Sequence, residues 1–220
     1  MNLFDLDSPP VRALTVVFNL ILLNWLFLFC SIPIITMGAS LTAMHHVVLE
    51  MIRKQDPSIA KSFFRAFKGN FRQATLTWLV YLALGTVLVV DYQVGSELLP
   101  GAAWTLVLAA MSVLAILWLL TWPYVFPMQA RYDNPIPQTI KNAFLVSIAN
   151  LPNSLIMVAI TLAVPYISWR YENTIPAVVL LSMFVLFSGV AYLNDLLVNR
   201  IFLRMFPEER EKQNEWNNPK

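Results

Sequence analysis

Long apolar stretches separated by short polar segments make up most of this chain. The first runs from Ala13 to Leu49 without an Asp, Glu, Lys or Arg, although a helix needs only about 20 residues to cross a bilayer. Pro33 lies inside it and lacks the amide hydrogen that a continuing helix uses, so we expect the first helix to end there. The pattern predicts an all-α, polytopic transmembrane bundle that forms a single membrane domain, residues 1–220. Its five spans are expected near residues 13–35, 74–90, 101–124, 154–169 and 175–193.

The segment at residues 37–52 is the ambiguous part of this pattern. Its apolar stretch from Leu41 to Ile52 is shorter than the usual helix that crosses the bilayer. We therefore expect it to lie along the membrane or to enter it and return. If it crosses instead, the chain has six spans and its N-terminus lies on the inner side.

Charged residues between the spans predict which loops face the cell interior. Six basic residues and one acidic residue occur between Arg53 and Arg72, and loops rich in Lys and Arg stay in the cytoplasm. The segment from Asp91 to Pro100 has two acidic residues and no basic one, which favours the outer side. With five spans the N-terminus is then outside, and the tail at residues 194–220 is cytoplasmic.

Two segments on the predicted cytoplasmic side share one layout, and we call them the elbows. Each has an Arg, a Pro four residues later, and Asp or Asn before that Pro: Arg53, Asp56 and Pro57 in the first elbow, and Arg131, Asn134 and Pro135 in the second. Asp or Asn can cap a helix N-terminus, and Pro fits the first helical position, so each elbow is predicted to start a short helix. The repetition indicates a parallel internal duplication, with coincidence as the alternative because such dipeptides are common helix starts.

The segment at residues 57–72 is predicted to be a cytoplasmic amphipathic helix. At about 100° per residue, its apolar and basic side chains fall in separate sectors: Phe63, Phe64, Phe67 and Phe71 on one face, and Lys61, Arg65, Lys68 and Arg72 on the other. Such a helix can lie in the headgroup region with its rings in the acyl boundary and its cations near anionic lipid. A strut that orients the next span is favoured over a docking or lipid-sensing surface.

Several short motifs resemble a known family. Asn24-Trp25-Leu26, Ile32-Pro33-Ile34 with Thr36 and Gly38-Ala39, Ala43, and the run from Phe63 to Gln73 that contains Asn70 are similar to the YesL-like family of bacterial integral membrane proteins, a domain of unknown function. The resemblance implies a multi-pass protein of the bacterial cytoplasmic (inner) membrane. Family members tend to be encoded beside binding-protein-dependent sugar importers, which implies an accessory role in carbohydrate uptake. No catalytic residue is established for the family, so none is carried over.

Composition and motifs exclude several classes of function. The chain is 58% hydrophobic and 13% charged, about half the charged fraction of a soluble domain. A single cysteine, Cys30, excludes an intramolecular disulfide and a multi-thiolate metal site. No GxSxG, Walker A or dinucleotide-type glycine pattern occurs, so we expect neither an enzyme nor a cofactor, and the net charge of +2 gives no reason to expect a nucleic-acid partner.

Three ionisable residues have chemistry to consider. His45 and His46 are weak metal candidates, because adjacent helical residues point about 100° apart and no HExxH pattern surrounds them. Asp195 follows the last predicted span and is expected to pair with Arg200 or another inner-face cation. Charged residues inside the predicted spans are absent, which argues against a proton-coupled carrier.

These observations favour an accessory or scaffold protein associated with a sugar ABC importer. The expected partners are the lipid bilayer, subunits of that importer and a second copy of the chain. The alternative is a small facilitator whose path is lined by uncharged polar residues such as Asn24, Thr77, Tyr81 and Thr121.

Overall fold

The computed structural model describes residues 9–55, 58–98, 101–206 and 210–211. This part of the chain is helical and contains no strand, so the prediction of an all-α fold is confirmed. In chain order the elements are α1 (Pro9–Ser31), η1 (Ile34–Thr36), α2 (Met37–Ile52), α3 (Ile59–Leu98), α4 (Ala102–Arg131), α5 (Ile136–Ala149), α6 (Leu151–Arg170), η2 (Glu172–Thr174), α7 (Ile175–Phe184) and α8 (Leu186–Met205).

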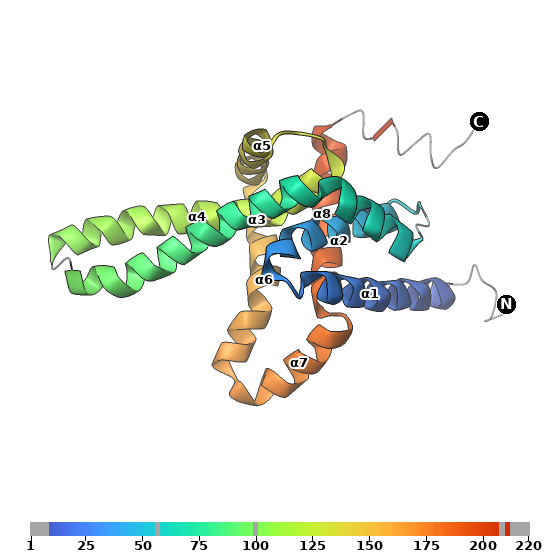
Figure 1. The fold of residues 1–220 in the computed structure, drawn as a ribbon, viewed down its shortest axis with the longest axis horizontal. Coiled ribbons are helices and arrows are strands. Elements are labelled where there is room, and N and C mark those ends of the chain that lie inside the picture. The colour runs from blue at the N-terminus through green and yellow to red at the C-terminus, as the bar shows by residue number, and fades with distance from the viewer. Residues whose placement is uncertain (1–8, 56–57, 99–100, 207–209, 212–220) are drawn as a thin grey trace.

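Three arms extend from a common centre (Figure 1). α3 and α4 form a long antiparallel hairpin on one side, α1 extends on the other, and α6 and α7 form a third arm that points downward in the view. The centre is built around α2, which packs against α1, α3, α4 and α8. Segments far apart in the sequence therefore meet at α2 and α8.

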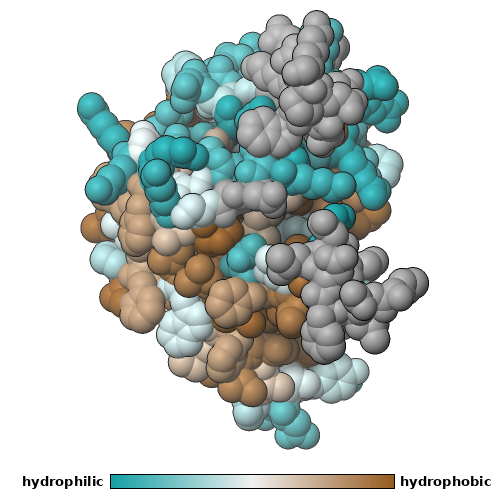
Figure 2. Space-filling model, turned by 90° about the vertical axis from the view of Figure 1, so that its right-hand side faces the viewer, coloured by the Kyte–Doolittle hydropathy of each residue, from teal (hydrophilic) through white to brown (hydrophobic). Residues whose placement is uncertain are grey.

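The solvent of most of this surface is lipid. Figure 2 shows a broad hydrophobic band between a hydrophilic upper part and a small hydrophilic lower end. Large apolar side chains such as Leu106, Leu14 and Phe18 are mostly exposed, and a water-soluble monomer does not expose contiguous apolar patches of this extent. Together with the long apolar helices, this surface identifies a membrane protein.

In the part of the chain that the structure describes, six helical segments are long and apolar enough to cross a membrane by length and composition. They are Pro10–Ser31, Ile34–Ile52, Ile59–Gly95, Ala102–Arg131, Leu151–Arg170 and Leu186–Met205. Two of them, residues 34–52 and α3, differ from the predicted spans in length. Residues 34–52 form one helical stretch of sufficient length, because η1 continues directly into α2. α3 joins the predicted amphipathic segment and the span at residues 74–90 into one continuous helix.

The predicted last span at residues 175–193 is wrong as a single helix. α7 ends at Phe184 and α8 begins at Leu186, with Val185 between them at φ −148° and ψ −6°. α8 then continues to Met205, so the start of the predicted tail at residue 194 is helical. No proline or glycine lies at residues 184–186, and the groups freed by the break are bonded to α1, as described below.

Close packing of α2 on α3 depends on Gly38, a residue of the family motif. A Cβ atom built on Gly38 would lie 2.3 Å from the backbone oxygen of Ala74 and 2.4 Å from Cβ of Trp78. Neither atom can swing aside as the end of a flexible side chain can. Only glycine therefore permits this separation, and small residues commonly allow such close contacts between membrane helices.

Candidate functional site

A buried acid and a buried histidine meet at the centre of the molecule. Nδ1 of His45 on α2 lies 3.0 Å and 2.9 Å from the two carboxylate oxygens of Asp195 on α8. Asp195 is 0% exposed and His45 is 8% exposed. An isolated buried carboxylate is costly to desolvate, and a hydrogen-bonded partner offsets that cost. The pair joins two helices that are 150 residues apart in the sequence.

Two expectations about charge are wrong at this point. The expected partner of Asp195, Arg200 or another inner-face cation, is replaced by His45, because five helical residues place Asp195 and Arg200 about 140° apart; Asp195 faces α2 and Arg200 is exposed. Charged residues were expected to be absent from the spans, yet Asp195 lies in the interior of Leu186–Met205, which is long and apolar enough to cross the membrane. The predicted last span ends at Leu193, which leaves Asp195 in the predicted tail.

The second histidine points elsewhere. Nδ1 of His46 lies 3.1 Å from the backbone oxygen of Ala130 on α4, and its Nε2 lies 3.3 Å from a carboxylate oxygen of Glu50. His45 and His46 therefore bind different partners, as their angular separation on the helix requires. Among the residues that the structure describes, no group of three or more His, Cys, Asp or Glu side chains is arranged to hold a metal ion.

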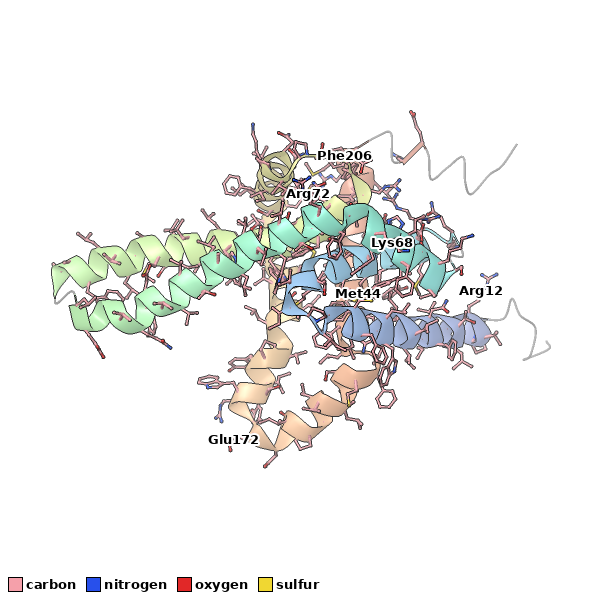
Figure 3. All side chains as sticks on the ribbon, in the orientation of Figure 1. Arg12, Met44, Lys68, Arg72, Glu172 and Phe206 are labelled. Carbon is pink, nitrogen blue, oxygen red and sulfur yellow. The ribbon has the colours of Figure 1, made fainter. Side chains whose placement is uncertain are left out.

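A cavity of about 290 Å³ lies beside the buried pair. Its polar lining includes His45, Asn194 and Thr161, and its other walls are apolar and aromatic. Nδ2 of Asn194 donates to Oγ1 of Thr161 over 3.1 Å, whereas Oδ1 of Asn194 is buried without a hydrogen-bond partner among the described residues. Met44, which also lines the cavity, lies at the centre of the molecule in Figure 3.

Asn24 from the family motif holds the break between α7 and α8. Its Nδ2 donates to the backbone oxygen of Ser182 over 2.9 Å, and its Oδ1 accepts from the backbone amides of Phe187 and Ser188 over 3.2 Å each. A broken helix leaves such groups unpaired, and lipid cannot satisfy them. One fully buried amide thus replaces three intrahelical partners. Asn24 therefore joins α1 to α7 and α8 by hydrogen bonds, and it satisfies the backbone groups that the break at Val185 leaves unpaired.

The other residues of the family motif shape the same region. Pro33 lies between α1 and η1, and Oγ1 of Thr36 donates to the backbone oxygens of Cys30 and Pro33 over 2.6 Å and 2.7 Å. These bonds close the turn between α1 and α2. Nδ2 of Asn70 donates to the backbone oxygen of Ala66, one turn earlier on α3.

The polar residues proposed to line a path are bonded separately. Oγ1 of Thr77 accepts from Nε2 of Gln129 over 3.0 Å, and the hydroxyl of Tyr81 donates to Oγ1 of Thr121 over 2.8 Å. Asn24 is at the α7–α8 break. These side chains serve as separate interhelical contacts.

The first elbow is anchored on α8. Nε of Arg53, which is buried, donates to Oδ1 of Asn199 over 2.9 Å. Asp56 and Pro57 lie outside the described residues. Glu50, just before this elbow, accepts hydrogen bonds from Ser62 and from Nη2 of Arg65, the latter over 3.1 Å. α2 and the start of α3 are thereby fastened together.

The second elbow starts a helix, but not with the expected cap. α5 begins at Ile136, with Pro135 in the N-cap position and without a side-chain cap. The backbone oxygen of Asn134, rather than its side chain, is the bonded group, since it accepts from Nε2 of Gln73 and from Oγ1 of Thr139. Arg131 is the last residue of α4. The two elbows are linked through α3, which carries Gln73.

The amphipathic segment is the first part of α3, and its aromatic face is divided. Phe63 is 0% exposed and belongs to the core formed with α1 and α2, and Phe67 packs against that core. Phe64 and Phe71 are 43% and 41% exposed. The prediction that all four rings enter the acyl boundary is wrong for Phe63, because α2 folds back and covers that face.

The basic face of the segment is exposed as predicted. Lys61, Arg65, Lys68 and Arg72 all have exposed side chains. Lys68, Arg72 and Phe206 lie in the upper half of Figure 3, opposite Glu172 at the lower end. The sides of the membrane assigned from the loop charges stay a prediction.

Sequence reasoning missed the pairing of His45 with Asp195 and the roles of Gln129 and Asn194. A signal was present in the polar positions of residues 194–199, where Asn194, Asp195 and Asn199 alternate with apolar residues at helical spacing. Such a pattern predicts a buried polar stripe if the helix continues. The predicted last span ends at Leu193, so these residues fall in the predicted tail.

Comparison with known proteins supports the family resemblance. The family model described as "Protein of unknown function, DUF624" matches residues 20–92, the part that contains Asn24, Pro33, Thr36, Gly38 and Asn70. "Uncharacterized protein YteU" of Bacillus subtilis (strain 168) is similar to this chain, with 23% identity over 194 residues that cover 87% of this chain and 83% of the relative. No solved structure matches. The resemblance to the YesL-like family is confirmed.

Proposed function

We propose that this chain is an accessory or scaffold protein of the bacterial cytoplasmic membrane that docks a sugar ABC importer through its cytoplasmic basic surface. We define that surface by the side chains of Lys61, Arg65, Lys68 and Arg72, which are exposed on one side of α3. No enzymatic step is part of the proposal.

The observation that carries the proposal is the rigid mounting of this surface. The helical turns that carry it are fixed by Phe63 in the core, by the bond of Ser62 to Glu50, and by the bond of Arg65, a member of the surface, to the same carboxylate. A mobile cationic segment loses backbone and side-chain freedom when it binds, whereas cations on a fixed helix lose only side-chain freedom. Such a row favours a partner with a complementary acidic surface and accelerates its association.

The choice of partner rests on the family resemblance. Members of the YesL-like family tend to be encoded beside binding-protein-dependent sugar importers. Neighbouring bacterial genes are commonly expressed together, as an importer and its accessory protein would have to be. The importer's permease and ATPase subunits both have cytoplasmic surfaces that this row of cations could meet.

The proposal is tested by capture from the native membrane after gentle solubilisation. The wild-type chain is expected to retain permease or ATPase subunits. A variant with Lys61→Glu, Lys68→Glu and Arg72→Glu is expected to lose them. The control carries the same change of charge at Lys141, Arg200 and Arg204, which are exposed elsewhere, and is expected to retain them. Absence of these subunits from the wild-type capture, with normal sugar uptake in a deletion strain, contradicts the proposal.

A second candidate is a small facilitator, and one observation favours it. The cavity beside His45 is lined by residues of six helices and lies at the centre of the fold. Uptake of a labelled sugar into proteoliposomes that contain only this chain supports the facilitator, and uptake equal to that of protein-free vesicles argues against it.

A further inference from the structure

The cavity at the centre has one polar end. It is lined by α1, α2, α3, α4, α6 and α8. Along α8 the lining residues run from Leu186 to Asn194, and along α6 from Thr161 to Pro165. These helices run in opposite directions (Figure 1), so Asn194 and Thr161 lie at the same end, where they are bonded to each other. His45 reaches this end through its contact with Asp195, the neighbour of Asn194.

Two polar atoms at this end have no partner among the described residues. Nδ1 of His45 is used on Asp195, which leaves Nε2 on the other side of the ring. Nδ2 of Asn194 is used on Thr161, which leaves Oδ1 buried and unbonded, on a residue that is 5% exposed. Leaving a buried acceptor unsatisfied typically costs about 1–3 kcal/mol. Native structures usually satisfy such a group with water or a ligand.

The remaining lining is apolar and aromatic. Trp78, Trp122 and Phe187 contribute ring surface, and Met44 contributes a flexible side chain. No Lys, Arg, Asp or Glu is among the residues that line the cavity. An anionic group therefore has no counter-charge there. A ligand that fits this distribution has a hydrocarbon body and one uncharged polar group.

We propose that this cavity binds a small apolar alcohol, with the hydroxyl at His45 and Asn194 and the hydrocarbon against the aromatic wall. A hydroxyl both donates and accepts. It can donate its one proton to Oδ1 of Asn194 and accept from Nε2 of His45 where that nitrogen carries a proton, or donate to one of these two atoms where both are acceptors. A carboxylate, which only accepts, and an ammonium group, which only donates, lack this double capacity. The binding site is independent of the accessory role proposed above.

The volume of the cavity guides the choice of a probe. If each non-hydrogen atom takes about the ~30 Å³ that a water molecule takes in the liquid, a volume of about 290 Å³ holds roughly ten such atoms. A lipid with two acyl chains is several times larger. A nine-carbon alcohol is therefore a suitable probe, and nonane, which lacks the hydroxyl, is its matched control.

The first experiment measures thermal unfolding of the full chain in lipid nanodiscs with 1-nonanol or nonane. A ligand that binds the folded state raises the unfolding temperature in proportion to its affinity. We expect 1-nonanol to stabilise the wild-type chain more than nonane does. Val190→Phe fills the cavity, since Val190 lines it, and is expected to abolish the effect. This variant also controls for changes that the alcohol causes in the bilayer, because those persist when the cavity is filled.

The second variant tests the polar end. Asn194→Leu removes the unbonded acceptor and is expected to weaken 1-nonanol binding about tenfold, the worth of one good hydrogen bond, with no effect on nonane. The control, Asn142→Leu, makes the same change on α5, away from the cavity, and is expected to bind like wild type. If Asn194→Leu does not fold, quenching of Trp78 and Trp122 by 9-bromo-1-nonanol is measured instead. The wild-type chain is expected to be quenched, and Val190→Phe is expected to be quenched less.

Three results overturn the proposal. One is equal stabilisation by 1-nonanol and nonane, which indicates apolar partition only. Another is undiminished stabilisation or quenching in Val190→Phe, which places the alcohol elsewhere. The third is binding of 1-nonanol to Asn194→Leu with wild-type affinity, which shows that the hydroxyl of the alcohol does not bind at the polar end.

Discussion

Replacement of Asn24 by Leu tests how the break between α7 and α8 is held. The substitution keeps the branching and the number of non-hydrogen atoms of a fully buried side chain and removes three hydrogen bonds to Ser182, Phe187 and Ser188. Side-chain hydrogen bonds between membrane helices contribute about 0.6 kcal/mol each on average, so three contribute about 2 kcal/mol. Backbone groups that lose a partner in a buried site add a further cost. We expect a loss of about 2–3 kcal/mol in the free energy of unfolding.

Unfolding by SDS in mixed micelles measures this loss. The control is Asn19→Leu, because Asn19 lies five residues earlier on α1, about 140° around the helix from Asn24, and is only partly buried. The control is expected to change the free energy of unfolding by less than about 0.5 kcal/mol, as surface changes usually do. Spin labels on α7 and α8 should also report a wider distribution of distances in Asn24→Leu. Equal stability of the two variants refutes the assignment of Asn24 to the break.

Three further predictions concern packing and topology. Phe63→Ala is expected to cost about 3–5 kcal/mol of unfolding free energy in the same assay, as for a buried aromatic residue, whereas Phe64→Ala is expected to cost less than about 1 kcal/mol; equal losses contradict the division of the aromatic face. Gly38→Ala is expected to cost about 1–3 kcal/mol by overpacking against α3, whereas Gly69→Ala, whose Cβ meets nothing within 4 Å, is expected to be neutral or stabilising by up to about 1 kcal/mol; the reverse order refutes the close contact. Lys68→Cys, in a cysteine-free background, is expected to react with an impermeant maleimide in inverted vesicles and not in intact cells. The number of spans is tested with a tag at the N-terminus. Protease access to the tag from the outside supports five spans, and access from the inside supports six.

Much of the architecture follows from local pattern. The helices and the basic face of α3 come from composition, periodicity and charge, which are properties of neighbouring residues. The prediction for Phe63 was wrong because a helical projection shows that a residue belongs to the apolar face but not whether protein or lipid covers it. The single span at residues 175–193 was wrong because Val185 is as compatible with a continuous helix as its neighbours are.

The sequence by itself determined the apolar surroundings of this protein and its helical class, because each depends on sums over many adjacent residues. Only the tertiary structure decided which buried polar groups meet. Asn24 binds the α7–α8 break and His45 binds Asp195 across intervals of about 160 and 150 residues in the chain. The energy of such a contact depends on the distance between two side chains in space, and spacing along the chain does not encode that distance.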